Sequence, residues 1–228
     1  MSDSRPRRPV AAHESLRDQV AEALRTALLT GDLRPGVVYS APALAAEYGV
    51  SATPVREAML DLAREGLVET VRNKGFRVTE ATERDLDDFT EVRALIEVPT
   101  VGRIAREAGP ERLEGLRPVA EETVAAARAG DLAAFLEADH RFHLGLLALA
   151  GNPRLVDTVA DLRRRSRLHG LGGFGGTRVL VESAREHGEL LDLMLAGDGP
   201  AAEACTRRHL ARVRSLWAAR RHRERPRP

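Results

Sequence analysis

Short amphipathic stretches alternate with turn residues along the first eighty residues of the chain. Apolar residues recur at helical spacing in three of these stretches, and a serine that can cap a helix precedes the second and the third. They predict helices over residues 15–29, 41–48 and 52–65. Two segments of alternating polar and apolar residues follow, at 67–71 and 75–79, and these predict two β-strands joined by a polar tip.

From residue 82 onward the spacing indicates helices only. Glycine and proline interrupt the pattern at 109–110, 130, 151–153, 170–176 and 197–200, so several separate helices are predicted. We therefore expect a mostly α protein, with an N-terminal winged helix-turn-helix and its small β-wing over residues 14–80, followed by an all-α helical bundle over residues 81–218. The basic ends, residues 1–13 and 219–228, are expected to be a disordered arm and a tail.

Length and composition agree with this division. A chain of 228 residues is long enough for two domains that each bury a core, and with only 4% aromatic residues those cores must be built from Leu, Ala and Val. One cysteine excludes an intramolecular disulfide and fits a reducing compartment. The N-terminus lacks the apolar core of a signal peptide, and no apolar run approaches the ~18 residues of a membrane span. We expect a cytoplasmic protein with no membrane contact.

Bulk charge does not predict nucleic-acid binding, because the net charge is +1 and residues 1–80 hold eleven basic and eleven acidic side chains. The placement of polar residues is more informative. The third predicted helix would enter the major groove, where Ser51 and Thr53 can bond bases or phosphates and Arg56 lies about one turn further along. Arg72 and Lys74 at the wing tip suit phosphates or the minor groove. Each residue alone could equally be solvated surface.

Polar residues interrupt the apolar stripes of three predicted helices in the second half. They are Asp139, His143, His187 and His209. Asp139 and His143 are four residues apart and so share one helix face. A buried carboxylate without a partner is costly, and a divalent cation would act as its counter-ion. One carboxylate and three imidazoles suit a divalent metal; zinc is the first choice, and Ni²⁺, Mn²⁺ or Fe²⁺ would also fit. The competing interpretation of each histidine is a core side chain bonded to a carbonyl.

Other residues of the same types are expected to lie outside this site. His140 is offset by about 100° around its helix. His13, His169 and His222 stand in polar or glycine-rich surroundings, which indicates surface positions. Cys205 precedes His209 by one turn and could reach the cluster, although a lone cysteine is more often a small buried hydrophobe. A G-x-G-x-x-G match within 170–176 follows an arginine-rich helix and no strand, so we reject it as a phosphate-binding loop.

Several motifs in series carry a resemblance to a known family. The segments 33–36, 50–58, 62–68 and the wing around Gly75 resemble the GntR family of bacterial transcription regulators. The helical remainder resembles the FCD effector domain of the FadR-type subfamily, with matching motifs at 139–143, 151–153, 186–187 and 208–210. The resemblance covers residues 14–218. It implies a homodimer that binds a palindromic DNA operator and is released, as a repressor would be, when a small carboxylate effector occupies a metal-containing cavity.

The resemblance also assigns roles and shows departures. Gly75 would join the DNA-contacting wing, and Arg93 matches an arginine near the effector cavity, although an ion pair with Glu97 is an equal alternative. Ala52 stands where the family usually has a polar residue, and Ala41 and Pro42 also depart, so the operator sequence cannot be inferred. An alternative function is a metal-dependent enzyme using the Asp/His₃ site. A third hypothesis is a helical scaffold with a structural metal; neither of these explains the N-terminal module.

Overall fold

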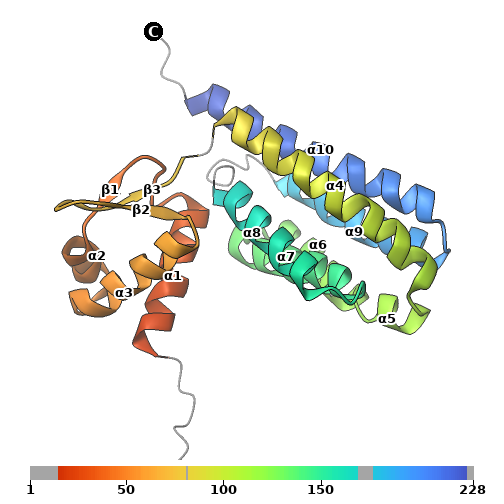
Figure 1. Ribbon diagram of the computed structural model, residues 1–228, viewed down its shortest axis with the longest axis horizontal. Helices are drawn as coiled ribbons and strands as arrows, with labels where there is room; N and C mark the ends of the chain where they lie inside the picture. The colour runs from red at the N-terminus through yellow and green to blue at the C-terminus, as the bar shows by residue number, and fades with distance from the viewer. Residues whose placement is uncertain (1–14, 81, 169–176, 225–228) are drawn as a thin grey trace, which may run out of the picture.

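The computed structural model describes residues 15–80, 82–168 and 177–224, and Figure 1 shows two parts that follow each other along the chain. Residues 15–80 form an N-terminal module of helices and a small sheet. The rest is helical. Each part has its own apolar core, because the buried cluster of the module involves only residues 20–78, whereas the other buried clusters lie beyond residue 85.

The N-terminal module has the predicted winged helix-turn-helix order. Its elements are α1 (Leu16–Thr30), β1 (Val38–Tyr39), α2 (Ala41–Tyr48), α3 (Ala52–Arg64), β2 (Val68–Val71) and β3 (Gly75–Val78). The Ser40 hydroxyl accepts a hydrogen bond from the Ala43 amide and caps α2, and Gly49 ends that helix in the left-handed conformation. A short turn therefore separates α2 from α3, as a helix-turn-helix requires.

The sheet contains one strand more than the sequence predicted. Its order is β1-β3-β2, all antiparallel, with Val38 opposite Arg77 and Tyr39 opposite Phe76. Gly75 begins β3 with φ at +132°, and a Cβ atom there would lie 2.2 Å from the Tyr39 carbonyl oxygen. A glycine is therefore needed for β1 to approach the wing, a structural role independent of any contact with DNA.

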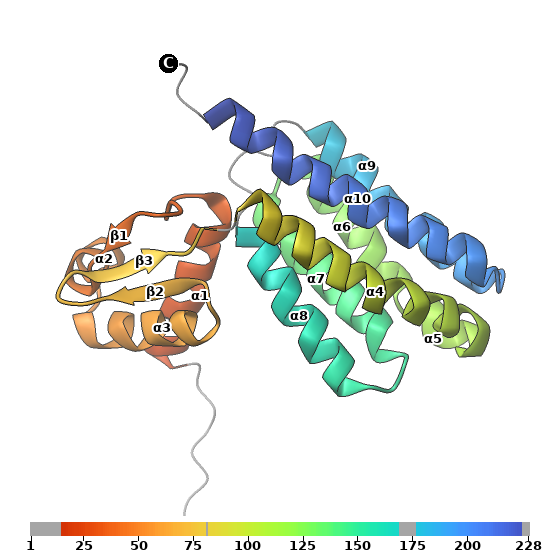
Figure 2. The same ribbon diagram turned by 45° about the horizontal axis from the view of Figure 1, so that its top comes forward.

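The second part is a bundle of helices, as predicted. Its elements are α4 (Glu83–Glu107), α5 (Pro110–Glu114), α6 (Arg117–Ala129), α7 (Leu132–Ala148), α8 (Pro153–Leu168), α9 (Thr177–Leu195) and α10 (Gly199–Glu224). The long helices α4 and α10 run side by side, and α6 packs against α7 and α9 (Figure 2). Among the described residues, every helix is too short or too polar to span a membrane.

Two boundaries differ from the sequence prediction. The helical stretch after Pro110 is broken again at Gly115, so a five-residue helix precedes α6. The last helix continues to Glu224, so the tail expected at 219–228 is helical over most of its length; the reason is that no glycine or proline interrupts residues 201–224. The expected N-terminal arm and the glycine-rich segment 170–176 lie outside the described residues.

Candidate metal centre and DNA-facing surface

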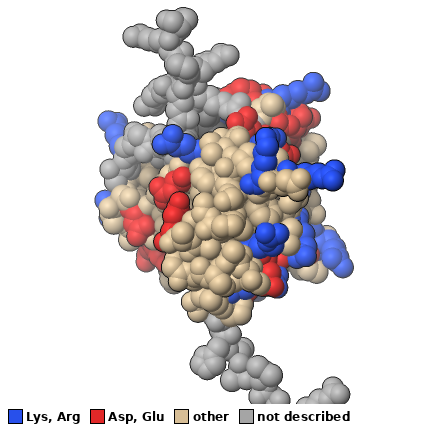
Figure 3. All heavy atoms as spheres, turned by 90° about the vertical axis from the view of Figure 1, so that its left-hand side faces the viewer, with Lys and Arg blue, Asp and Glu red and all other residues tan. Residues whose placement is uncertain are grey.

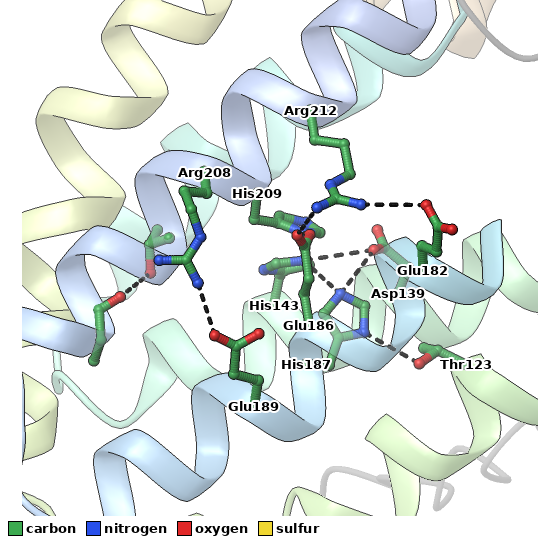
Figure 4. A network of polar contacts seen from close by, with 12 residues as sticks. Thr123, Asp139, His143, Glu182, Glu186, His187, Glu189, Arg208, His209 and Arg212 are labelled. Atoms are coloured by element: carbon green, nitrogen blue, oxygen red, sulfur yellow. Dashed lines mark hydrogen bonds and ion pairs between the residues drawn. The ribbon is translucent and has the colours of Figure 1, made fainter. Parts of the chain in front are cut away.

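The four polar residues predicted from the helix stripes meet in the interior of the bundle. Helix α7 supplies Asp139 and His143, α9 supplies His187 and α10 supplies His209. One ligand atom from each residue lies within 4.8 Å of the others, and all four side chains are buried. Figure 4 shows these side chains converging from three helices.

The ligand-type atoms of this cluster lie close together. The Nε2 atoms of His143 and His187 are 3.1 Å apart. The Oδ1 atom of Asp139 is 3.3 Å from Nε2 of His187 and 3.5 Å from Nε2 of His143. The ring of Phe142 stacks on His187 with centroids 4.4 Å apart, which excludes water from that side. A carboxylate oxygen and two imidazole nitrogens thus face a common point in an apolar interior.

Groups from neighbouring helices hold the outer atoms of the cluster. The Oδ2 atom of Asp139 accepts a hydrogen bond of 2.8 Å from Arg163 of α8. Nδ1 of His187 lies 3.1 Å from the Thr123 hydroxyl of α6, and Nδ1 of His209 lies 2.8 Å from Oε2 of Glu186 on α9. These outer contacts orient the side chains so that Oδ1 of Asp139 and Nε2 of His143 and His187 face one another.

Burial keeps the imidazoles in the form that binds metal. Desolvation lowers the pKa of His187, and it lowers the pKa of His143 together with the nearby positive charge of Arg163. Burial alone would raise the pKa of Glu186, but its hydrogen bond with His209 and the charge of Arg212 outweigh that effect and lower it. His143 and His187 are thus neutral donors, as a metal site requires.

The donor set and its dimensions fit a divalent metal ion. Ligand atoms at about 2.1 Å from an ion lie at most about 4.2 Å apart, slightly less than the 4.8 Å spread of this cluster. A small contraction would therefore suffice for Asp139, His143, His187 and His209 to hold one ion. Such an ion supplies Lewis acidity, and four protein ligands leave room for an external carboxylate on a metal that accepts five or six ligands.

The other sequence candidates lie outside this group of four. Cys205 is buried in the apolar core between the helices, and burial raises the pKa of its thiol to about 11. His140 is half-buried and does not belong to the group. Arg93 is buried with Nε 2.6 Å from Oε1 of Glu97, so the ion pair that competed with an effector contact is present. His13, His169 and the side chain of His222 are outside what the structure describes.

The residues expected to contact DNA are exposed on two elements of the N-terminal module. Ser51, Thr53 and Arg56 are exposed at the start of α3, and Arg72 and Lys74 are exposed at the tip between β2 and β3. Ser51 makes no capping hydrogen bond, so its hydroxyl is available to a ligand. In Figure 3, which faces this module, basic side chains gather along the right-hand border beside a broad uncharged area.

Two further groups of residues belong to these surfaces and were not predicted from the sequence. On α3, Leu60 and Arg64 are exposed and continue the face of Arg56 by helical spacing, a signal that was already present in the sequence. Around the cluster, Thr123 and Arg163 come from helices α6 and α8, which carried no candidate ligand. Their contribution could not be inferred because it depends on how those helices pack.

Comparisons with known proteins agree with the two-part organisation. Residues 16–78 match the family model described as bacterial regulatory proteins, gntR family, and residues 88–212 match the FCD domain. A regulator in an unstable DNA locus of Streptomyces ambofaciens is 34% identical over 83% of this chain and 80% of its own length. A probable D-xylose utilization operon repressor of Paenarthrobacter nicotinovorans is 30% identical over 85% of this chain and 84% of its own.

A solved structure resembles the whole arrangement. The E. coli McbR/YncC structure superposes with a TM-score of 0.76 at 25% identity, and covers 92% of this chain and 100% of its own. The likeness therefore includes both parts of the molecule and their order.

Proposed function

Because this chain belongs to the gntR family of bacterial regulatory proteins and carries an FCD domain, we propose that a divalent metal ion and a small carboxylate effector in its helical domain control its binding to DNA. The family and the similar proteins are transcriptional regulators and not enzymes. The alternative of a metal-dependent enzyme is therefore set aside. A cytoplasmic location follows from the DNA target, and membership of the FadR subgroup is part of the proposal.

Each of the two parts with its own apolar core has a separate proposed function. Residues 14–80 would read the operator, and residues 81–218 would bind metal and effector. On the DNA side, the start of α3 would enter the major groove, where Ser51, Thr53 and Arg56 reach base edges or phosphates. The wing tip, with Arg72, Lys74 and Gly75, would lie along the adjacent backbone. The exposed Leu60 would add an apolar contact of the kind that a thymine methyl group accepts.

The observation that carries the metal proposal is the convergence of four buried ligand-type atoms from three helices within 4.8 Å. The charges around them support an anionic effector. Arg163 links Asp139 to Glu97, which also binds Arg93, so two positive and two negative charges balance in this buried chain. A bound divalent cation would leave the interior net positive, which favours an anion such as a carboxylate as the additional ligand.

We propose Arg93 as an effector-binding residue only because it belongs to this series of buried ion pairs. It lies two ion pairs away from Arg163, and a direct contact with an effector would require Arg93 to share or leave Glu97. An effector that draws Arg93 away would leave Glu97 to Arg163 alone. Such an exchange would shift α4 relative to α8, and α4 directly follows the DNA-reading module in the chain.

A homodimer is proposed from an exposed face of α4. Leu95 is 69% exposed, and at helical spacing it shares this face with the exposed residues Asp88, Val92, Pro99 and Arg103. When two such helices pair antiparallel about the middle of this face, Asp88 stands opposite Arg103 of the partner subunit. Apolar residues in the centre with complementary charges at both ends suit a two-fold contact between copies. Two modules held in this way would meet a palindromic operator, with half-sites about one helical turn apart.

The experiment that tests the proposed function is a titration of a labelled upstream promoter fragment with the full chain. It compares zinc-loaded protein, chelator-treated protein, and zinc-loaded protein with a panel of small mono-, di- and tricarboxylates. We expect at least one carboxylate to weaken DNA binding in the zinc-loaded protein and none to do so after chelation. Equal responses with and without metal would contradict the proposal.

A further inference from the structure

The outer contacts of the histidine cluster are made by groups whose hydrogen-bonding capacity is already partly committed. The Thr123 hydroxyl donates to the Ala120 carbonyl over 2.6 Å. Its single proton is thereby used, and toward Nδ1 of His187, 3.1 Å away, the oxygen acts as an acceptor. Nδ1 of His187 must therefore carry the ring proton, which leaves Nε2 with its lone pair.

His209 is oriented in a similar way by a different group. Its Nδ1 lies 2.8 Å from Oε2 of Glu186. The other oxygen of Glu186, Oε1, lies 3.0 Å from the Arg212 guanidinium, which holds the carboxylate in its ionised, acceptor-only form. Nδ1 of His209 therefore carries a proton, and in the neutral ring Nε2 keeps its lone pair. Figure 4 shows Arg212 reaching both Glu186 and Glu182.

The tautomer of His187 with its proton on Nδ1 places a lone pair, and not a proton, opposite Asp139. Nε2 of His187 faces Nε2 of His143 at 3.1 Å and Oδ1 of Asp139 at 3.3 Å. A lone pair that points at a carboxylate oxygen is repelled, and the opposite tautomer of His187 would relieve this by donating to Asp139. Thr123 holds the tautomer of His187 that has no proton on Nε2. The space between Nε2 of His187 and Oδ1 of Asp139 therefore suits a cation.

We propose that Thr123 and Glu186 are positioning residues that fix the ring tautomers of His187 and His209 with Nε2 toward the metal. This inference rests on the proposed metal site and extends it to residues that touch no metal themselves. Outer partners of ligating histidines act in this way by orienting the ring and raising its basicity. Glu186 is buried and Thr123 has no exposed surface, so both hydrogen bonds lie in the interior of the bundle.

The test measures zinc affinity of the full chain by competition with a chromophoric chelator. Thr123→Val keeps the side-chain shape and removes the acceptor, whereas Thr123→Ser keeps the hydroxyl. Glu186→Ala removes the His209 contact, and Glu182→Ala is its matched control, because Glu182 contacts Arg212 but lies one helical turn away on α9. We expect Thr123→Val and Glu186→Ala each to weaken zinc binding by about 10- to 100-fold, and the controls to stay within about twofold of wild type.

Two readouts separate positioning from a purely structural role. The visible spectrum of the Co²⁺-loaded protein should change in Thr123→Val and return in Thr123→Ser, while thermal unfolding in chelator confirms that the apo variants fold. Independently of any variant, two-bond ¹H–¹⁵N correlation spectra of the chelator-treated wild type should show His187 and His209 protonated at Nδ1.

The outcomes distinguish this inference from the function on which it rests. Wild type that binds no zinc would overturn the metal site itself. Wild type that binds zinc while Thr123→Val and Glu186→Ala bind it equally well would overturn the positioning role alone. Spectra that place the ring proton on Nε2 of either histidine would do the same.

Discussion

Replacing His143 with alanine tests the metal site most directly, and His140 three positions earlier on the same helix is the matched control. His143 is buried with Nε2 facing His187 and Asp139, whereas His140 is half-buried outside the group of four. Structural zinc held by four protein ligands contributes about 10–16 kcal/mol, or about 2.5–4 kcal/mol for each ligand. His143→Ala should therefore weaken zinc binding on the order of 100- to 1000-fold.

The assay must separate lost metal from lost packing, because removing a buried imidazole also leaves a cavity in the apoprotein. The quantity to compare is the stabilisation that zinc adds, measured by urea unfolding with and without zinc. At free zinc 100 times the wild-type Kd, zinc adds about 2.7 kcal/mol to wild type, and about 0.4 kcal/mol to a variant that binds 100-fold more weakly. Elemental analysis gives the stoichiometry in parallel.

His143 is not a metal ligand if His143→Ala retains stoichiometric zinc and gains as much stability from zinc as the wild type does. The choice of His143 over His140 is also wrong if His140→Ala loses the zinc that His143→Ala keeps. A wild type without stoichiometric metal after metal-supplemented purification would discard the ligand assignment as a whole.

Three further results are expected. Arg56→Ala should weaken operator binding by roughly 1–3 kcal/mol in a gel-shift titration at fixed salt, whereas Arg112→Ala on the distant helical domain should not; equal losses would count against the assigned DNA face. Leu95→Glu should yield a monomer by light scattering at micromolar concentration, because it places a charge at the centre of the proposed dimer contact. A dimer would exclude this face of α4 as the contact between subunits. Stability of the apoprotein should fall as pH drops below 6.5, because burial lowers the pKa of His143 and His187 and the unfolded chain then binds more protons; a flat profile between pH 7.5 and 5.5 would contradict this.

The sequence by itself determined the type and order of the elements. Capping serines, left-handed glycines and helical spacing are local signals, so they placed α2, α3 and the wing within a residue or two. The same spacing identified Asp139, His143, His187 and His209 as polar residues on apolar faces. The local pattern could not show β1, because its two residues become a strand only by pairing with β3 far along the chain.

Only the tertiary structure decided what those residues face. That four side chains from three helices share one point depends on the packing of α7, α9 and α10, which spacing within one helix cannot specify. The outer partners show this most clearly, since Thr123 and Arg163 stand on helices with no candidate ligand and reach the cluster only through packing. The sequence likewise left Arg93 open between an effector and Glu97, and the fold places its guanidinium on Glu97 because both lie buried on one face of α4. Local spacing fixes which side of a helix a residue occupies, whereas contacts between residues distant in the chain depend on the global arrangement that buries the most apolar surface.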